Sequence, residues 1–195
     1  MENKKIYIVL TRTNTILSRM IGFIKDDEYT HASISLDKSL AKMYSFGRKY
    51  TYNPFVGRFV EENFNEGVYG RCDDLKGLVM EIDVTHEQYR KAEKFISKFI
   101  SNSKLYKYNY MGLFNCLLGK ELCNNQRFLC SEFVYYILNK SGIVNINKPR
   151  NLVRPQDLYN INGRIIFEGN LKNTSWSGRI YERNEFIQGY KYAKI

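Results

Sequence analysis

Apolar and polar positions alternate along the chain in patterns that predict short strands and amphipathic helices. Strand-like runs, rich in β-branched and aromatic residues, occur at 5–11, 29–36, 41–46, 77–84 and 164–168. Helix-like runs, with apolar residues three and four positions apart, occur at 13–24, 85–100, 108–118, 129–141 and 155–159. The strands fall in hairpin-like pairs and the helices cluster, so we expect an α+β fold rather than a doubly wound sheet.

Local signals set some of the boundaries. Thr85 and Gln88 form a capping-box pattern at the start of one helix, and Gly142 is typical of the end of another. Residues 47–70 carry aromatic side chains without a clear period, which predicts a long loop that covers a substrate. We expect one domain over 1–195, with a C-terminal extension from about residue 172.

The composition describes a chain that can bury a core and that carries excess positive charge. Hydrophobic residues make up 44% of its 195 residues, and 30 Lys and Arg against 20 Asp and Glu give a net charge of +10. The excess favours anionic partners. Because the cations are scattered rather than gathered in a run, the pattern does not favour nucleic acid as a partner.

The sequence shows no signal peptide and no apolar stretch of transmembrane length, so we expect a cytoplasmic protein with reduced thiols. Cys116, Cys123 and Cys130 recur every seven residues, which on a helix would separate neighbouring sulfurs by about 10 Å. Zinc sites use closer ligand pairs, so we expect neither a metal nor another cofactor. The pattern leaves the oligomeric state open.

Cys130 differs from the other cysteines because it comes immediately before the apolar stripe of its predicted helix. A thiol in the first helical turn meets free N–H groups and the positive end of the helix dipole, which favour the thiolate. A small buried core residue is the alternative interpretation. Of the 2 histidines, His86 falls among polar residues and reads as a surface side chain. His31 lies in a predicted strand between small residues, so it is the better candidate for a base.

The segments around these two residues, Tyr29 to Asp37 (YTHASISLD) and Phe128 to Leu138 (FLCSEFVYYIL), resemble the NlpC/P60 superfamily of papain-like cysteine hydrolases. The histidine strand precedes the cysteine helix, as in the circularly permuted YiiX/YaeF-like group. Weaker similarity covers 108–114 and 154–158. The resemblance implies a permuted papain-like fold, in which a small antiparallel sheet or barrel packs against helices that include the Cys-headed one.

The resemblance also implies roles for individual residues. Cys130 would be the nucleophile and His31 its base. A third group usually orients the imidazole from the next strand; that strand has no carboxylate or amide here, so Ser45 is the candidate. The remaining candidates, for substrate or oxyanion contacts, are Tyr110, Gln126 and Ser131.

The implied activity is that of a thiol hydrolase or acyltransferase. It would act on an amide or ester bond of a peptidoglycan-type peptide, a small-molecule amide or a lipid acyl group. The absence of a carboxylate or amide orienter supports an alternative, a non-catalytic binding module for an anionic lipid or a cell-wall ligand.

Overall fold

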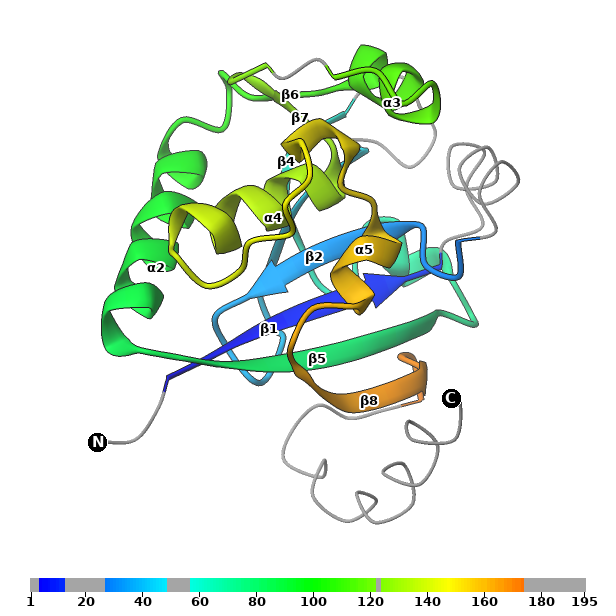
Figure 1. Cartoon of the computed structure of the whole chain (residues 1–195). Coiled ribbons are helices and arrows are strands. Elements are labelled where there is room, and N and C mark those ends of the chain that lie inside the picture. The colour runs from blue at the N-terminus through cyan, green and yellow to red at the C-terminus, as the bar shows by residue number, and fades with distance from the viewer. Residues whose placement is uncertain (1–3, 13–26, 49–56, 122–123, 174–195) are drawn as a thin grey trace, which may run out of the picture.

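The computed structural model describes residues 4–12, 27–48, 57–121 and 124–173 (Figure 1). The helix predicted at 13–24 and nearly all of the predicted extension from 172 lie outside these residues. The strands are β1 (Lys4–Thr11), β2 (His31–Ser35), β3 (Met43–Arg48), β4 (Gly57–Glu62), β5 (Lys76–Val84), β6 (Lys107–Tyr108), β7 (Arg127–Phe128) and β8 (Arg164–Asn170). The helices are α2 (His86–Ser101), α3 (Tyr110–Leu117), α4 (Cys130–Lys140) and α5 (Pro155–Tyr159), with 3₁₀ turns η1 (Tyr69–Arg71) and η2 (Arg150–Leu152).

Within the described residues, the eight strands form one open sheet in the order β7-β6-β4-β3-β2-β1-β5-β8. Neighbouring strands are antiparallel except β6 and β7, which run parallel. The α+β class predicted from the sequence is therefore confirmed. The expectation of a small antiparallel sheet or barrel is corrected in size and closure, because the sheet has eight strands and is open, and it is antiparallel apart from the β6–β7 pair.

The periodic segments gave the right element types. All five predicted strands and the four predicted helices that fall on described residues are present, with ends within two residues of the prediction. The capping box of α2 is also confirmed, since the Gln88 N–H donates to the Thr85 hydroxyl at 3.2 Å and the Thr85 N–H to the Gln88 side chain at 2.9 Å. These contacts satisfy two N–H groups that the helix itself leaves unpaired.

The predicted loop at 47–70 is a correction. Its second half contains β4, which pairs with β3 in register from Met43–Glu62 to Arg48–Gly57, and ends in η1. Phe59 of β4 is buried whereas Arg58 is exposed, so the strand has one side in the core despite its charged sequence. This hairpin extends the sheet beyond β3 and brings new side chains to the histidine strand.

Helix α4 packs on the middle of the sheet, against β2 and β3, with α2 and α5 beside it (Figure 1). An aromatic cluster holds it there. Phe133 of α4 has ring centroids of Phe46 (β3) and Phe59 (β4) at 5.5 Å and of Phe99 (α2) at 5.0 Å. Burial of such large rings is the main stabilising contribution to the contact. The packing fixes the start of α4 above the strand that carries His31.

Candidate functional site

Cys130 is the first residue of α4 and is almost fully buried. The preceding residue, Leu129, has extended backbone angles and offers no side-chain cap. Instead the Glu132 carboxylate reaches back and accepts the Leu129 N–H at 3.1 Å. The N–H of Ser131 donates to the Cys130 sulfur. The sulfur therefore lies at the positive end of the helix, in contact with a backbone donor.

His31 begins β2, and its imidazole shares a hydrogen bond with the Cys130 thiol. The Ala32 N–H donates to the same sulfur. Burial alone would raise the pKa of Cys130, but the charge and hydrogen bond of His31 together with the backbone donors outweigh it, so the thiol pKa is lowered. The sulfur is therefore predisposed to be a thiolate.

The pKa of His31 moves in the opposite direction. Burial would lower it, but the negative charges of Glu62 and of the Cys130 thiolate, with the hydrogen bond to Cys130, raise it well above the ordinary value. An imidazolium beside a thiolate is the arrangement that activates a cysteine nucleophile near neutral pH. The two expected residues, His31 and Cys130, are thus brought together with a consistent charge distribution.

Glu62, at the end of β4, is the group that orients the imidazole. His31 Nε2 lies 3.1 and 3.2 Å from the two Glu62 carboxylate oxygens. Because a carboxylate only accepts hydrogen bonds, Nε2 carries a proton, and Nδ1 is the nitrogen left to face Cys130. The Ser33 hydroxyl donates to Glu62 Oε2 at 2.6 Å and holds the carboxylate in place. The side chains of His31 and Glu62 remain 15% and 16% exposed, which leaves access from solvent.

Ser45 does not have the orienting position expected from the sequence. Its hydroxyl is fully buried and donates to the Ala32 carbonyl at 2.6 Å. Strands β2 and β3 are in register at Ile34–Tyr44, and this side-chain bond links them one step nearer to His31. Ser45 therefore holds the strands together, and the carboxylate comes from the following strand, β4.

Gly47 leaves room for the contact between the carboxylate and the imidazole. A Cβ added at this position would lie 3.2 Å from Glu62 Oε1, 3.4 Å from Val60 Cγ2 and 3.8 Å from His31 Cε1. The first two distances are at or below the tight end of ordinary contacts. A glycine here lets the Glu62 side chain cross β3 to reach the imidazole.

A buried tyrosine packs beside the histidine. The Tyr69 ring meets the His31 ring edge-on, with centroids 6.1 Å apart, and its hydroxyl shares a 3.2 Å hydrogen bond with Thr11. Burial, reinforced by the Glu62 charge, raises the pKa of Tyr69 to about 12. A neutral phenol that keeps its proton can therefore form one wall of the site. Like Glu62, it comes from the segment predicted to be a loop.

The three residues expected near the substrate or oxyanion are distributed differently. The Ser131 hydroxyl is buried and donates to the Val153 carbonyl at 2.7 Å, so only its N–H is directed to the sulfur. Gln126 is exposed in the turn before β7, where its N–H donates to the Asn124 side chain. Tyr110 begins α3, and its hydroxyl lies near Gly57. The Ser131 side chain and the Gln126 N–H therefore have other partners among the described residues than the Cys130 sulfur.

Tyr108 was not predicted as a site residue from the sequence, but it interacts with Cys130. It is buried at the end of β6, its ring centroid is 4.8 Å from that of Tyr110, and it interacts electrostatically with Cys130. Burial, followed by the Cys130 charge, raises the pKa of Tyr108 well above its ordinary value. Its hydroxyl therefore keeps its proton and remains a potential donor beside the nucleophile. Strand β6 has only two residues, Lys107 and Tyr108, so the sequence gives no sign that Tyr108 is in a strand and faces the site.

A buried ion pair fixes the start of α4 from the other side. Arg150 of η2 donates from Nε to Glu132 Oε1 at 2.9 Å, and its guanidinium lies 4.7 Å from the Phe128 ring centroid. Glu132 is completely buried, so it needs this partner and the Leu129 N–H to satisfy its oxygens. The pair connects the cysteine-bearing turn to η2 and β7.

The motif at 154–158 anchors the segment that leads into β2. Arg154 donates from Nη1 to both Asp27 oxygens, at 2.7 and 2.9 Å. The Arg154 N–H in turn donates to Asp157, at the start of α5. A two-oxygen contact of this kind holds the chain just before His31 in a defined position.

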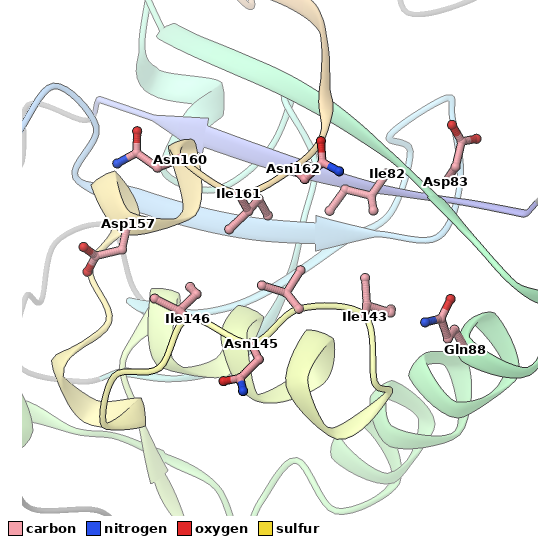
Figure 2. Close-up of a pocket in the computed structure, with 11 residues that line it drawn as sticks. Ile82, Asp83, Gln88, Ile143, Asn145, Ile146, Asp157, Asn160, Ile161 and Asn162 are labelled. Carbon is pink, nitrogen blue, oxygen red and sulfur yellow. The ribbon is translucent and has the colours of Figure 1, made fainter.

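A separate hollow of about 560 Å³ lies away from this site (Figure 2). Ile82 of β5, Gln88 of α2, the loop at 143–146 and the segment from Asp157 to Asn162 line it. The loop follows the C-terminal end of α4, whereas Cys130 is at the N-terminal end of this 11-residue helix, which is roughly 16 Å long. The hollow is therefore remote from the thiol.

The described residues contain neither a cluster of metal-binding side chains nor a helix suited to a membrane. No three or more His, Cys, Asp or Glu side chains lie together in a way that could hold a metal ion. No helix in this part of the chain is both long and apolar enough to cross a bilayer.

Comparisons of the chain with protein-family models, with curated proteins and with solved structures give no match.

Proposed function

We propose that the protein is a cysteine hydrolase or acyltransferase of the circularly permuted papain-like type. The observation that carries the proposal is a continuous chain of side-chain contacts from Cys130 through His31 to Glu62. A nucleophile, a base and a group that orients the base are the minimum set for covalent acyl transfer. The lowered pKa of Cys130 and the raised pKa of His31 support the same assignment.

The reaction follows from the positions of these groups. The Cys130 thiolate attacks the carbonyl carbon of an amide or ester, and the carbonyl electrons move to oxygen. The Cys130 N–H at the start of α4 and the Tyr108 hydroxyl are the donors we assign to that oxyanion. His31 then gives its proton to the leaving amine or alcohol as the tetrahedral species collapses to a thioester. Water or an acceptor amine or alcohol attacks the thioester while His31 takes up its proton, which regenerates the thiolate.

The order of the elements supports the permuted form of the fold. The histidine strand β2 precedes the cysteine helix α4, and α4 packs directly on β2. The eight-stranded open sheet is larger than the small sheet that the resemblance implies. The additional strands include β4, which supplies Glu62, and β6, which supplies Tyr108.

The alternative of a non-catalytic binding module was based on the lack of a carboxylate or amide that could orient the His31 imidazole. Glu62 argues against this alternative, because its carboxylate contacts His31 Nε2. The substrates we propose remain the three classes with a suitable carbonyl: peptidoglycan-type peptides, small-molecule amides and lipid acyl groups.

Alkylation by iodoacetamide, followed residue by residue with mass spectrometry, tests the nucleophile. Cys116 is a suitable internal control, because it is a half-buried cysteine outside any disulfide in the same chain. We expect Cys130 to react faster than Cys116 near neutral pH despite its deeper burial, and His31→Ala to remove the difference. Equal rates at the two thiols would contradict an activated nucleophile.

A second experiment tests acyl transfer itself. Incubation with p-nitrophenyl acetate should release nitrophenol in a burst and leave an acetyl group on Cys130 alone. Cys130→Ser, which preserves the size of the side chain, should abolish the burst. A reactive Cys130 that alkylates rapidly but never carries an acyl group would contradict the proposed chemistry.

A further inference from the structure

Three positively charged side chains form a row across one end of the sheet. Arg58 of β4 lies opposite Lys107 of β6, and Lys107 lies beside Arg127 of β7. Directly paired residues on neighbouring strands point to the same face, and the strands are about 4.8 Å apart. All three residues are exposed, whereas their neighbours Phe59 and Tyr108 are buried. We call Arg58, Lys107 and Arg127 the cationic row.

The row has no acidic partner among the described residues. The ion pairs found there involve other lysines and arginines, and no hydrogen bond from the row's side chains to a carboxylate is present in that part of the structure. Like charges placed directly opposite each other on paired strands destabilise a sheet. The three positive charges, unpaired among the described residues, are therefore available to an anionic partner in solution or on a surface.

Exposed apolar side chains gather in the same stretch of chain. Four large hydrophobic residues are strongly exposed in the described part of the chain, and three fall between 105 and 118: Leu105 at 61%, Met111 at 68% and Leu118 at 55%. Met111 belongs to α3 and Leu118 follows it directly. Figure 1 shows α3, β6 and β7 together at one end of the molecule.

More positive charge lies in the same stretch of chain as these apolar residues. Lys104 and Lys120 are exposed, and neither has an ion pair among the described residues. Between 104 and 127, four Lys and Arg residues stand against a single acid, Glu121. A surface that combines exposed apolar side chains with a surrounding excess of cations complements an anionic lipid bilayer. The apolar groups can enter the acyl boundary while the cations meet the headgroups.

We propose that the end of the molecule formed by the cationic row and the exposed residues of α3 docks on an anionic membrane surface. Nucleic acid is the weaker alternative, because it would use the cations but would leave Leu105, Met111 and Leu118 exposed. The contact we propose is with the surface of the bilayer, where cations meet the headgroups and apolar side chains enter the acyl boundary.

The docking surface and the candidate active site lie on opposite sides of β6. Lys107 is exposed, whereas the next residue, Tyr108, is buried and interacts electrostatically with Cys130. Successive side chains of a strand point to opposite faces, so the cations can meet a bilayer without covering the thiol. The inference does not depend on the proposed function, since a bilayer could bind this surface even if Cys130 were inert.

Vesicle co-sedimentation of the full chain tests the proposal. Vesicles of phosphatidylcholine with a third phosphatidylglycerol should bind the protein, and pure phosphatidylcholine should bind it much less. Each cation near an anionic surface contributes enough that replacing Arg58, Lys107 and Arg127 by Gln should weaken binding on the order of 100-fold. The matched control is Lys94→Gln, Lys98→Gln and Lys140→Gln, which removes the same charge from exposed positions on α2 and α4.

Two further variants separate the contributions and exclude misfolding as a cause. Met111→Ser with Leu118→Ser should weaken vesicle binding roughly tenfold or more with the net charge unchanged. Lys107→Glu places an acid between two arginines, so it should unfold at higher urea concentration than the wild type and yet lose vesicle binding. A loss of binding in a protein that has become more stable cannot result from unfolding.

Three results would overturn the proposal. The first is equal binding to neutral and anionic vesicles. The second is an equal loss of binding in the α2 and α4 control. The third is binding to a soluble polyanion, such as a DNA duplex, that matches vesicle binding and is insensitive to Met111→Ser with Leu118→Ser.

Discussion

Replacing Glu62 by Gln tests the electrostatic explanation of the thiol directly. The carboxylate lies 3.1 Å from His31 Nε2, so the two charges are about 4 Å apart and interact by about 4 kcal/mol at an effective dielectric constant of about 20. Both side chains are 15 to 16% exposed, and glutamine keeps a neutral hydrogen bond, so we take about half of this value as lost. A loss of about 2 kcal/mol corresponds to a roughly 30-fold smaller thiolate population near neutral pH.

The assay is the pH profile of Cys130 alkylation by iodoacetamide, read by mass spectrometry. In Glu62→Gln the rate near neutral pH should fall by that factor, while the rate at high pH should approach the wild-type rate because the thiol is then ionised in both proteins. Glu61→Gln is the matched control, since Glu61 is half-exposed and lies 3.8 Å from Lys42. An unchanged profile in Glu62→Gln, or an equal change in Glu61→Gln, would refute the reasoning.

Three further predictions follow from contacts around the site. Gly47→Ala should slow Cys130 alkylation several-fold and reduce the free energy of unfolding by about 1 kcal/mol, because the added Cβ would displace the Glu62 carboxylate. Alkylation rates measure the first effect and urea unfolding measures the second. Arg150→Ala should lower the free energy of unfolding by about 3 to 5 kcal/mol in urea titrations, because it leaves a buried carboxylate of α4 without its partner. The contribution of the Cys130–His31 pair to the free energy of unfolding should also depend on pH. It should rise with pH up to the ordinary His pKa of 6.5, because the thiol loses its proton at lower pH in the folded protein than in the unfolded one. It should stay level up to the ordinary thiol pKa of 9.0 and fall above it, because the folded imidazole keeps its proton to a higher pH than the unfolded one. Urea unfolding across this pH range checks the profile, and Cys130→Ser should lack the rise on the acid side.

The elements that could be predicted are those in which the order of apolar and polar residues matches the order of buried and exposed positions. The run from Lys5 to Thr11 is apolar because β1 lies in the middle of the sheet, covered on both faces. The helix at 85–100 shows a helical period and a capping box, both of which are local properties. The placement of Cys130 ahead of its apolar stripe likewise reflects a helix boundary.

The parts that were missed depend on tertiary pairing. Strand β4 reads GRFVEE, where Phe59 and Val60 are adjacent and charges surround them, so alternation is weak. It is a strand because β3 pairs with it, and the position of Glu62 beside His31 follows from that pairing alone. Strands β6 and β7 have two residues each, too few for any period to be visible. Glu62 comes from β4 and Tyr108 from β6, two strands that the local sequence does not reveal. For that reason Ser45 and Tyr110 were predicted in their roles.

His31 and Cys130 come from segments far apart along the chain, and only the packing of α4 on β2 brings them together. In a chain that has not yet completed this packing, the sulfur has no imidazole beside it and behaves as an ordinary thiol. The rate at which Cys130 reacts is therefore a built-in reporter of the fully assembled state. A brief alkylating pulse during refolding, read by mass spectrometry, would mark the moment at which α4 packs on β2.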